Sequence, residues 1–278
     1  MSKADIFDSI HHIPPSSEPY GLRRRLNDRI FVRGLLRETR VLLSSLATAS
    51  NTNKRFLIVA RARSGTKLLT RLLDSHSRIH CDREVFNRNV IAPAAYFDRL
   101  AGKVEAEAYG AKILSDHMVI AHRMYRPDKV FGQMAARGVH LIHLERSSLM
   151  QAISSMVAGI RGQLHSDRGA QTLSKKTYLS PPDFVQRLRW TEALLEYEKA
   201  ALKDLPRLHI SYEQGLLGQK AQNETVARVC DLLDLPVEEV AEPLKKLLPN
   251  DAKDIIENYD EVRSAVIESG LAHLLPEA

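Results

Sequence analysis

A short apolar run, followed by a loop of small and basic residues and then by a helical pattern, constrains this chain more than any other feature. Residues 56–60 read Phe-Leu-Ile-Val-Ala, which is typical of a strand buried on both faces of a parallel sheet. Residues 66–76 carry four leucines on one helix face. Strand, tight loop and helix in this order predict the first unit of an α/β domain.

A second unit of the same kind begins with the apolar run 139–144, which leads through a short loop into a helical pattern over 148–160. A weaker strand is predicted at 208–211. Strands that alternate with long helices predict a three-layer α/β fold of the P-loop type, with a central parallel sheet flanked by helices and with helix-rich N- and C-terminal parts. Further helices are predicted over 183–203, 223–233, 237–247 and 252–269.

The length of 278 residues, 44% of them apolar, suits one large domain with its own core. We expect the α/β domain to span 51–278. The first part of the chain, 1–50, is predicted to hold an irregular arm over 1–20 and a basic amphipathic helix over 21–46. This helix could contact an anionic membrane peripherally or bind a partner, although a surface helix that covers the domain is the simpler interpretation.

Cysteine usage and charge narrow the class of protein. Only Cys81 and Cys230 are present, which excludes a disulfide scaffold and a Cys-rich zinc module and fits a reducing compartment. No apolar run approaches the roughly 20 residues of a membrane-spanning helix, so a cytoplasmic location is expected. The excess of 40 Lys and Arg over 34 Asp and Glu, a net charge of +6, leaves nucleic acid, anionic lipid and a phosphorylated cofactor as candidate partners.

The loop after the first strand has the features of an anion site. A chain that turns sharply at Gly65 into a helix leaves several backbone N–H groups aimed at one point, where the helix dipole adds positive potential. Arg63 can add a charge-assisted hydrogen bond, and the hydroxyls of Ser64 and Thr66 can donate further ones. Such a loop binds phosphate or sulfate, although a capped turn with exposed arginines would look the same. The loop reads Arg61-Ala62-Arg63-Ser64-Gly65-Thr66-Lys67-Leu68.

This loop lacks the parts that bind magnesium in nucleotide-hydrolysing enzymes. Their loops begin with Gly and place Ser or Thr directly after Lys, whereas here Ala60 holds the first position and Leu68 follows Lys67. The second strand ends in Glu145-Arg146 rather than in a metal-binding aspartate. An anion loop without a metal site favours transfer of a group less charged than phosphate, which protein cations alone could stabilise. No metal is therefore expected.

Arg146 and Ser154 form a second candidate site. Arg146 lies at the carboxyl end of its predicted strand, where ligands of open α/β sheets bind. Ser154 follows eight residues later in the next helix, so one phosphate could lie between the two side chains. On its own, the simpler interpretation of this pair is an ordinary surface arginine and a helix serine.

Glu84 is the candidate general base. A carboxylate beyond the helix of the anion loop can return to the strand ends and take a proton from an acceptor hydroxyl. On position alone, an exposed acid paired with Arg83 or Arg88 is the simpler interpretation. His117 and His122 are the reserve candidates.

Together these motifs resemble those of sulfotransferases that use 3′-phosphoadenosine 5′-phosphosulfate (PAPS). In that family the loop for the 5′-phosphosulfate reads Pro-Arg-Ser-Gly-Thr or Pro-Lys-Ser-Gly-Thr after a strand, and residues 62–66 fit with Ala62 in place of Pro. The family's 3′-phosphate site is an Arg at a strand end with a Ser eight residues later, as in Arg146 and Ser154. The resemblance covers about residues 54–263 in scattered blocks.

The resemblance implies a role for each block. Glu84 stands where the tyrosylprotein branch has its proposed base, and residues 208–213 match a strand that ends in Tyr-Glu, whose tyrosine, here Tyr212, lies near the nucleotide. Segment 254–262 is similar to bacterial nodulation-type and other carbohydrate sulfotransferases. The implied activity is PAPS-dependent transfer of a sulfuryl group to a hydroxyl on a sugar or glycolipid, with catalytic residues Glu84 and Arg63. The implied nucleotide-binding residues are Arg63, Ser64, Gly65, Thr66, Lys67, Leu68, Arg146, Ser154 and Tyr212.

Two departures from the family's patterns disfavour two classes of acceptor. Ala158 replaces a further arginine of the tyrosylprotein branch, which argues against a protein tyrosine. The Arg-Lys-Gly nucleotide loop of the steroid and phenol enzymes is absent, which argues against those acceptors.

Two other functions remain as alternatives. One is a P-loop nucleotide or small-molecule kinase, and the other is a non-enzymatic module that binds an anion or a nucleic acid through its arginine-rich residues 21–40, although no nucleic acid is expected to bind.

Overall fold

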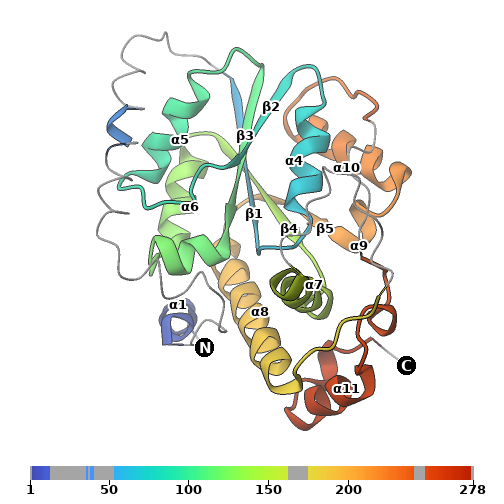
Figure 1. The fold of residues 1–278 in the computed structure, drawn as a ribbon. Coiled ribbons are helices and arrows are strands. Elements are labelled where there is room, and N and C mark those ends of the chain that lie inside the picture. The colour runs from blue at the N-terminus through green and yellow to red at the C-terminus, as the bar shows by residue number, and fades with distance from the viewer. Residues whose placement is uncertain are drawn as a thin grey trace.

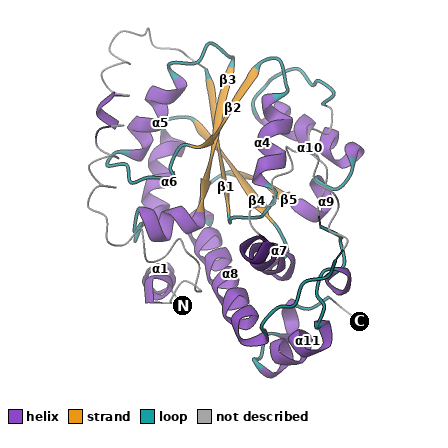
Figure 2. Cartoon of the chain, viewed as in Figure 1, coloured by secondary structure: helices purple, strands orange, loops and turns teal. Residues whose placement is uncertain are grey.

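The computed structural model of the chain describes residues 2–12, 36, 38–40, 53–161, 175–240 and 248–276. Its centre is a five-stranded sheet in the order β2-β3-β1-β4-β5, with every neighbouring pair parallel. Helices cover both faces of this sheet (Figures 1 and 2), which confirms the predicted three-layer α/β fold. The strands are β1 (Lys54–Ala60), β2 (Ile79–Glu84), β3 (Ala108–Leu114), β4 (Val139–Glu145) and β5 (Arg207–Ser211).

Side chains of β1 alternate between two hydrophobic clusters. Phe56, Ile58 and Ala60 pack with α4 (Thr66–Asp74) and α10 (Gln219–Leu232). Leu57 and Val59 point the other way, toward the second layer of helices. Both faces of the central strand are therefore buried, as its continuous apolar run predicts. The second layer consists of α5 (Pro93–Ala101), α6 (Pro127–Ala136) and α8 (Pro181–Leu202).

A third cluster forms beside the sheet, where α7 (Ser148–Arg161) packs against α8 and against α11 (Tyr259–Glu268). The predicted helix 252–269 is wrong as one continuous element, because it divides into a 3-10 turn, η2 (Ala252–Asp254), and α11. The chain between them instead pairs with residues 177–179. Ile255 accepts from the Thr177 N–H at 2.8 Å, and the Asn258 amide bonds both backbone groups of Leu179 at 3.0 Å. Tertiary hydrogen bonds thus override the local helical pattern.

The sequence patterns missed β2 and β3. Edge strand β2 reads Ile-His-Cys-Asp-Arg-Glu and is apolar only at alternate positions. Strand β3 is buried throughout yet contains a glycine and a lysine, so it does not read as an apolar run. Gly110 is required there because a Cβ atom would lie 2.0 Å from Cζ of the Phe56 ring on the neighbouring strand.

Residues 1–20 do not form a wholly irregular arm, because α1 spans Lys3–His12. Phe7 and Ile10 are three residues apart, share one helix face and are fully buried. The Phe7 ring meets Tyr197 of α8 edge-to-face, with ring centroids 5.5 Å apart. This contact across the chain supplies the stability that the local pattern of α1 lacks.

Other predictions fall partly outside the described residues. The expected basic helix over 21–46 lies outside them except for residues 36 and 38–40, where the Glu38 carboxylate accepts from the N–H groups of Ile91 and Ala92 beside α5. The predicted helix over 237–247 is not helical at 237–240, and its remainder is not described. Among the described helices, none combines the length and the apolar character needed to cross a bilayer. The remaining short elements are η1 (His117–Ala121), α9 (Tyr212–Gly215) and η3 (Ala272–Leu274).

Candidate active site

The anion loop, residues 61–68, follows central strand β1 and includes the first turn of α4. Arg63 has φ 66° and Gly65 has φ 89°, so the backbone turns through the left-handed region twice within three residues. Such alternation makes a concave set of N–H groups. Gly65 meets a second demand, since a Cβ atom there would lie 2.4 Å from Cδ2 of Tyr212.

Two side chains hold the carbonyl groups of this loop. Gln151 Nε2 donates to the carbonyl of Ala62 at 2.5 Å, and Arg146 Nη1 donates to that of Arg63 at 2.8 Å. Among the described residues, neither carbonyl accepts a backbone N–H from the first turn of α4. Within the described part of the chain, the N–H groups of Gly65 and Thr66 have no backbone acceptor. The loop therefore presents donors at the start of a helix, where the dipole favours an anion.

Ser64 adds a hydroxyl to this set of donors. Its side chain is fully buried, and its Oγ has no hydrogen-bond partner among the described residues. A buried hydroxyl without a partner is unfavourable unless a ligand or water satisfies it. Lys67 and Leu68, the other two nucleotide-binding candidates of the loop, lie half-buried in the first turn of α4.

Arg61 stabilises the loop from inside the protein, where a ligand cannot reach its side chain. Its guanidinium is fully buried and donates to Ser148 Oγ at 2.8 Å and to the carbonyl of Arg146 at 2.6 Å. Its Nε lies 4.0 Å from Oε2 of buried Glu198. This arginine thus ties the end of β1 to the start of α7.

Arg146 follows β4 directly and is buried, as is Ser154 in α7. The Arg146 guanidinium lies over the Tyr212 ring at 4.5 Å from the centroid, and its Nε has no hydrogen-bond partner among the described residues. Burial lowers the pKa of Arg146, a penalty that a bound anion would offset. Ser154 Oγ donates to the Met150 carbonyl at 2.7 Å, so its hydroxyl would have to rotate to donate to a phosphate.

Glu84 is the last residue of β2, so its carboxylate lies at the carboxyl edge of the sheet. Its partners are neither Arg83 nor Arg88. Oε1 lies 3.3 Å from Nζ of Lys112, and Oε2 lies 3.9 Å from Nε2 of His117. The Glu84 side chain is 36% exposed, which leaves it accessible to an acceptor. The other reserve base, His122, instead contacts the Phe86 carbonyl through Nε2 at 2.8 Å.

Lys112 is the functional residue that the sequence patterns missed. It lies in β3, is almost fully buried, and its Nζ donates to Thr66 Oγ1 at 3.3 Å. Burial lowers the pKa of Lys112, and the Glu84 carboxylate opposes that shift. A buried lysine within a strand needs an acidic partner. Once β3 had been recognised as a strand, the lysine at position 112 would therefore have indicated a nearby carboxylate. Lys112 connects the candidate base to the anion loop.

The structure therefore brings most of the predicted residues to one edge of the sheet. The loop after β1, Glu84 at the end of β2, Arg146 after β4 and Tyr212 after β5 all lie at carboxyl ends of parallel strands, where ligands of open α/β sheets bind. The Arg146 side chain contacts the Arg63 carbonyl of the loop and the Tyr212 ring. Lys112 lies between Glu84 and Thr66 of the loop. Such a site can hold an anionic ligand beside a proton acceptor.

Comparisons with known proteins concern the arrangement of the elements. No family model matches the chain, and no curated protein matches its sequence. A sulfotransferase from Alicyclobacillus acidocaldarius matches with a TM-score of 0.47 and 16% identity, covering 80% of this chain and 97% of its own. Mouse sulfotransferase SULT7A1, complexed with PAP, matches with a TM-score of 0.42 and 13% identity, and the match covers 84% of this chain and 90% of the mouse chain. Sulfotransferase STF9 from Mycobacterium avium matches with a TM-score of 0.45 and 10% identity, and the match covers 95% of this chain and 88% of the STF9 chain.

Proposed function

We propose that this protein is a PAPS-dependent sulfotransferase that moves a sulfuryl group to a hydroxyl acceptor. The observation that carries the proposal is the chain of contacts from Glu84 through Lys112 to Thr66, with both Lys112 Nζ distances at 3.3 Å. Only the Lys112 side chain separates the Glu84 carboxylate from the anion loop. The sequence of that loop lacks the hydroxyl that binds magnesium in nucleotide-hydrolysing enzymes. A proton acceptor next to a phosphate or sulfate cradle is what group transfer to a hydroxyl requires.

Two groups of residues suit a nucleotide that carries phosphates on the 3′ and 5′ positions of its ribose. Buried Ser64 Oγ and the N–H groups of Gly65 and Thr66 are donors without acceptors among the described residues, and they would hold the 5′-phosphosulfate with Arg63, Lys67 and Leu68. Arg146, whose Nε also lacks an acceptor there, would hold the 3′-phosphate with Ser154, beside the Tyr212 ring. The donor supplies a sulfuryl group on a good leaving group, so no metal need take part.

Glu84 would accept the proton of the acceptor hydroxyl as the hydroxyl oxygen attacks the sulfur of the donor in line. The bond from sulfur to the 5′-phosphate oxygen would break, and PAP would leave. Lys112 would orient the Glu84 carboxylate and, through Thr66, neutralise charge that builds at the loop. Its buried ammonium acts in a region of low dielectric, where such a charge has most effect. Arg63 is an exposed residue of the loop, and its guanidinium would bind the oxygens of the 5′-phosphosulfate.

A sugar or glycolipid is the proposed acceptor class. Its support is the similarity of segment 254–262 to carbohydrate sulfotransferases and the alanine at position 158 in place of a tyrosylprotein-type arginine. The Ala158 side chain is buried within α7, so this position offers no cation to an acidic peptide.

Calorimetric titration of the full chain with 3′-phosphoadenosine 5′-phosphate (PAP), compared with ATP and magnesium, tests the donor class. We expect micromolar binding of PAP and none of ATP, and the reverse result would favour the kinase alternative. Glu84→Gln should abolish turnover and leave PAP binding nearly intact, because the carboxylate acts on the acceptor. Glu107→Gln is the matched control, since this exposed glutamate pairs with Arg78. Equal loss of turnover and PAP binding in Glu84→Gln would exclude Glu84 as the base.

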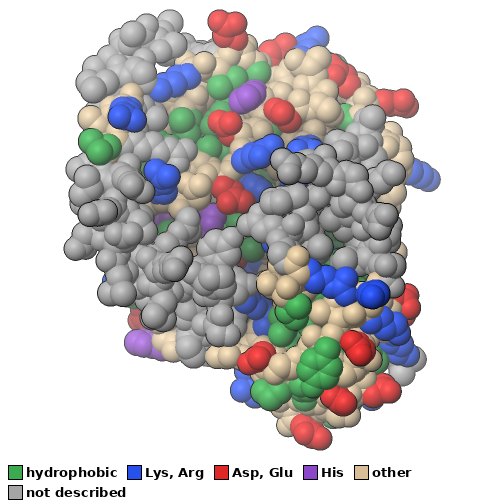
Figure 3. Space-filling model, in the orientation of Figure 1, with side chains coloured by type: hydrophobic (Ala, Val, Ile, Leu, Met, Phe, Trp, Pro, Cys, Tyr) green, Lys and Arg blue, Asp and Glu red, His purple; other side chains and the backbone are tan. Residues whose placement is uncertain are grey.

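The binding-module alternative predicts salt-dependent binding to DNA or anionic vesicles that is lost when residues 1–50 are removed. On the face drawn in Figure 3, Lys and Arg side chains of the described residues occur in separate groups with acidic side chains between them. The described residues on this face therefore form no broad basic surface.

A further inference from the structure

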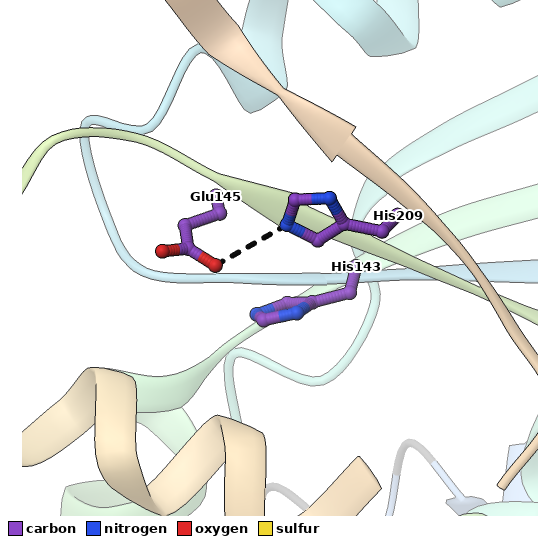
Figure 4. A group of neighbouring side chains, drawn as sticks. All are labelled: His143, Glu145 and His209. Carbon is purple, nitrogen blue, oxygen red and sulfur yellow. Dashed lines mark hydrogen bonds and ion pairs between the residues drawn. The ribbon is translucent and has the colours of Figure 1, made fainter. Parts of the chain in front are cut away.

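Two histidines and a glutamate form a cluster outside the anion loop (Figure 4). His143 and Glu145 belong to β4, and His209 belongs to β5. Each offers one ligand atom, and the three atoms all lie within 4.8 Å of one another. No part of the proposed transfer reaction uses these side chains.

The backbone brings the three side chains to one face. His143 and Glu145 are two residues apart on a strand, so they point to the same side of the sheet. His209 pairs with His143 in the parallel β4–β5 register, which directs its side chain to that side as well. The cluster is therefore built on paired strands, where ligand positions are more rigid than on loops.

Glu198 of α8 fixes the buried member of the cluster. Its Oε2 lies 3.0 Å from His143 Nε2, and its other oxygen accepts from the Ser115 hydroxyl. A carboxylate against the imidazole orients the ring and raises its basicity, which is the usual surrounding of a metal-binding histidine. Glu198 thus orients the His143 ring, and Ser115 in turn holds the Glu198 carboxylate.

The cluster is closed on one side and open on the other. The His143 side chain is 2% exposed, whereas Glu145 is 29% and His209 is 53% exposed. Glu145 Oε2 already lies 3.2 Å from His209 Nε2, close to the roughly 3.3–3.6 Å that separates neighbouring ligands of a tetrahedral ion with bonds of about 2.0–2.2 Å. Rotation of exposed side chains can therefore complete the geometry, and the open side leaves room for a water ligand.

We propose that His143, Glu145 and His209 bind one Zn²⁺ ion, with water at the remaining position. Two imidazoles and one carboxylate are a common ligand set for zinc, whereas magnesium and calcium take oxygen ligands. Lys199 Nζ, now 3.9 Å from Glu145 Oε1 and 46% exposed, would move aside as the ion enters. The ion would link edge strand β5 to β4 next to Arg146, with one coordination position open to water.

Calorimetry of the tag-free full chain, stripped with chelator and titrated with zinc chloride, tests this site. One zinc per chain is expected. His209→Ala should weaken binding by more than about 100-fold, beyond what loss of an outer-shell partner does, and its exposed side chain can be removed without disturbing the core. His140→Ala is the matched control, because position 140 lies on the same strand and alternates to the opposite face.

A second measurement separates ligation from folding. Co²⁺ in place of zinc should give the absorption bands of a four-coordinate site in the parent chain and in His140→Ala, and these bands should be lost in His209→Ala. The proposal is wrong if the parent chain binds no zinc, or if His209→Ala binds zinc as tightly as the parent. It is equally wrong if binding is lost instead in His80→Ala, since His80 lies 3.7 and 3.6 Å from Asp74 and Asp82.

Discussion

The Arg146 guanidinium lies over the Tyr212 ring, 4.5 Å from its centroid, and so links the residue after β4 to the residue after β5. The same guanidinium bonds the Arg63 carbonyl. One buried cation therefore contacts two other sequence segments of the candidate nucleotide site, the loop and the residue after β5.

Tyr212→Leu should weaken PAP binding by roughly 2- to 30-fold, because a cation–π contact contributes about 0.5–2 kcal/mol and positions the guanidinium. Tyr212→Phe keeps the ring and should bind PAP nearly as well as the parent chain. Calorimetry measures both variants. Equal weakening in Phe and Leu variants would assign the effect to the hydroxyl and not to the ring.

Gly65→Ala should destabilise the fold by about 1–3 kcal/mol and reduce PAP binding, since φ is 89° and the new Cβ would lie 2.4 Å from the Tyr212 ring. Gly132→Ala is the control. No atom lies within 4 Å of a Cβ there, and within helix α6 the change should stabilise by up to about 1 kcal/mol. Urea unfolding measures both. A neutral Gly65→Ala variant would contradict the strained turn.

Lys112→Met should lower kcat by about 100-fold or more, because it removes a preorganised buried cation, while the Kd for PAP changes much less. Lys129→Met, at an exposed position of α6, should leave both unchanged. Steady-state kinetics and calorimetry separate the two quantities. If Kd rises while kcat at saturating donor stays unchanged, Lys112 acts in donor binding alone.

Stability should fall as pH drops from about 7.5 to 5.5, in part through His122. Burial lowers the pKa of His122, so the unfolded chain takes up its proton at higher pH than the folded chain, and acid favours unfolding below about 6.5. His122→Gln removes this proton uptake and should make the fall shallower. It should not abolish the fall, because burial also lowers the pKa of His11 and His140.

Urea unfolding at several pH values measures this effect. The control is His80→Gln, at a side chain that is 46% exposed. The free energy of unfolding of this variant should fall with decreasing pH as steeply as that of the parent chain. An unchanged slope in His122→Gln would mean that His122 does not contribute to the acid sensitivity.

Local patterns predicted the elements whose apolar spacing is unbroken. β1, β4, α4 and α7 begin and end within two residues of their predicted bounds. The missed strands β2 and β3 carry the polar residues of the site, Glu84 and Lys112, and for that reason lack an apolar run. The helix at 3–12 and the break before α11 also escaped prediction, since both depend on partners far away in the chain.

Strand, turn and helix signals are local, so the parallel α/β fold and the candidate anion loop could be predicted from the sequence alone. Three contacts became evident only in the folded chain: Lys112 joins Glu84 to the loop, Arg146 lies over Tyr212, and His143 meets His209 across two strands. These contacts depend on strand order and register, which pairing among distant segments sets and no local pattern encodes.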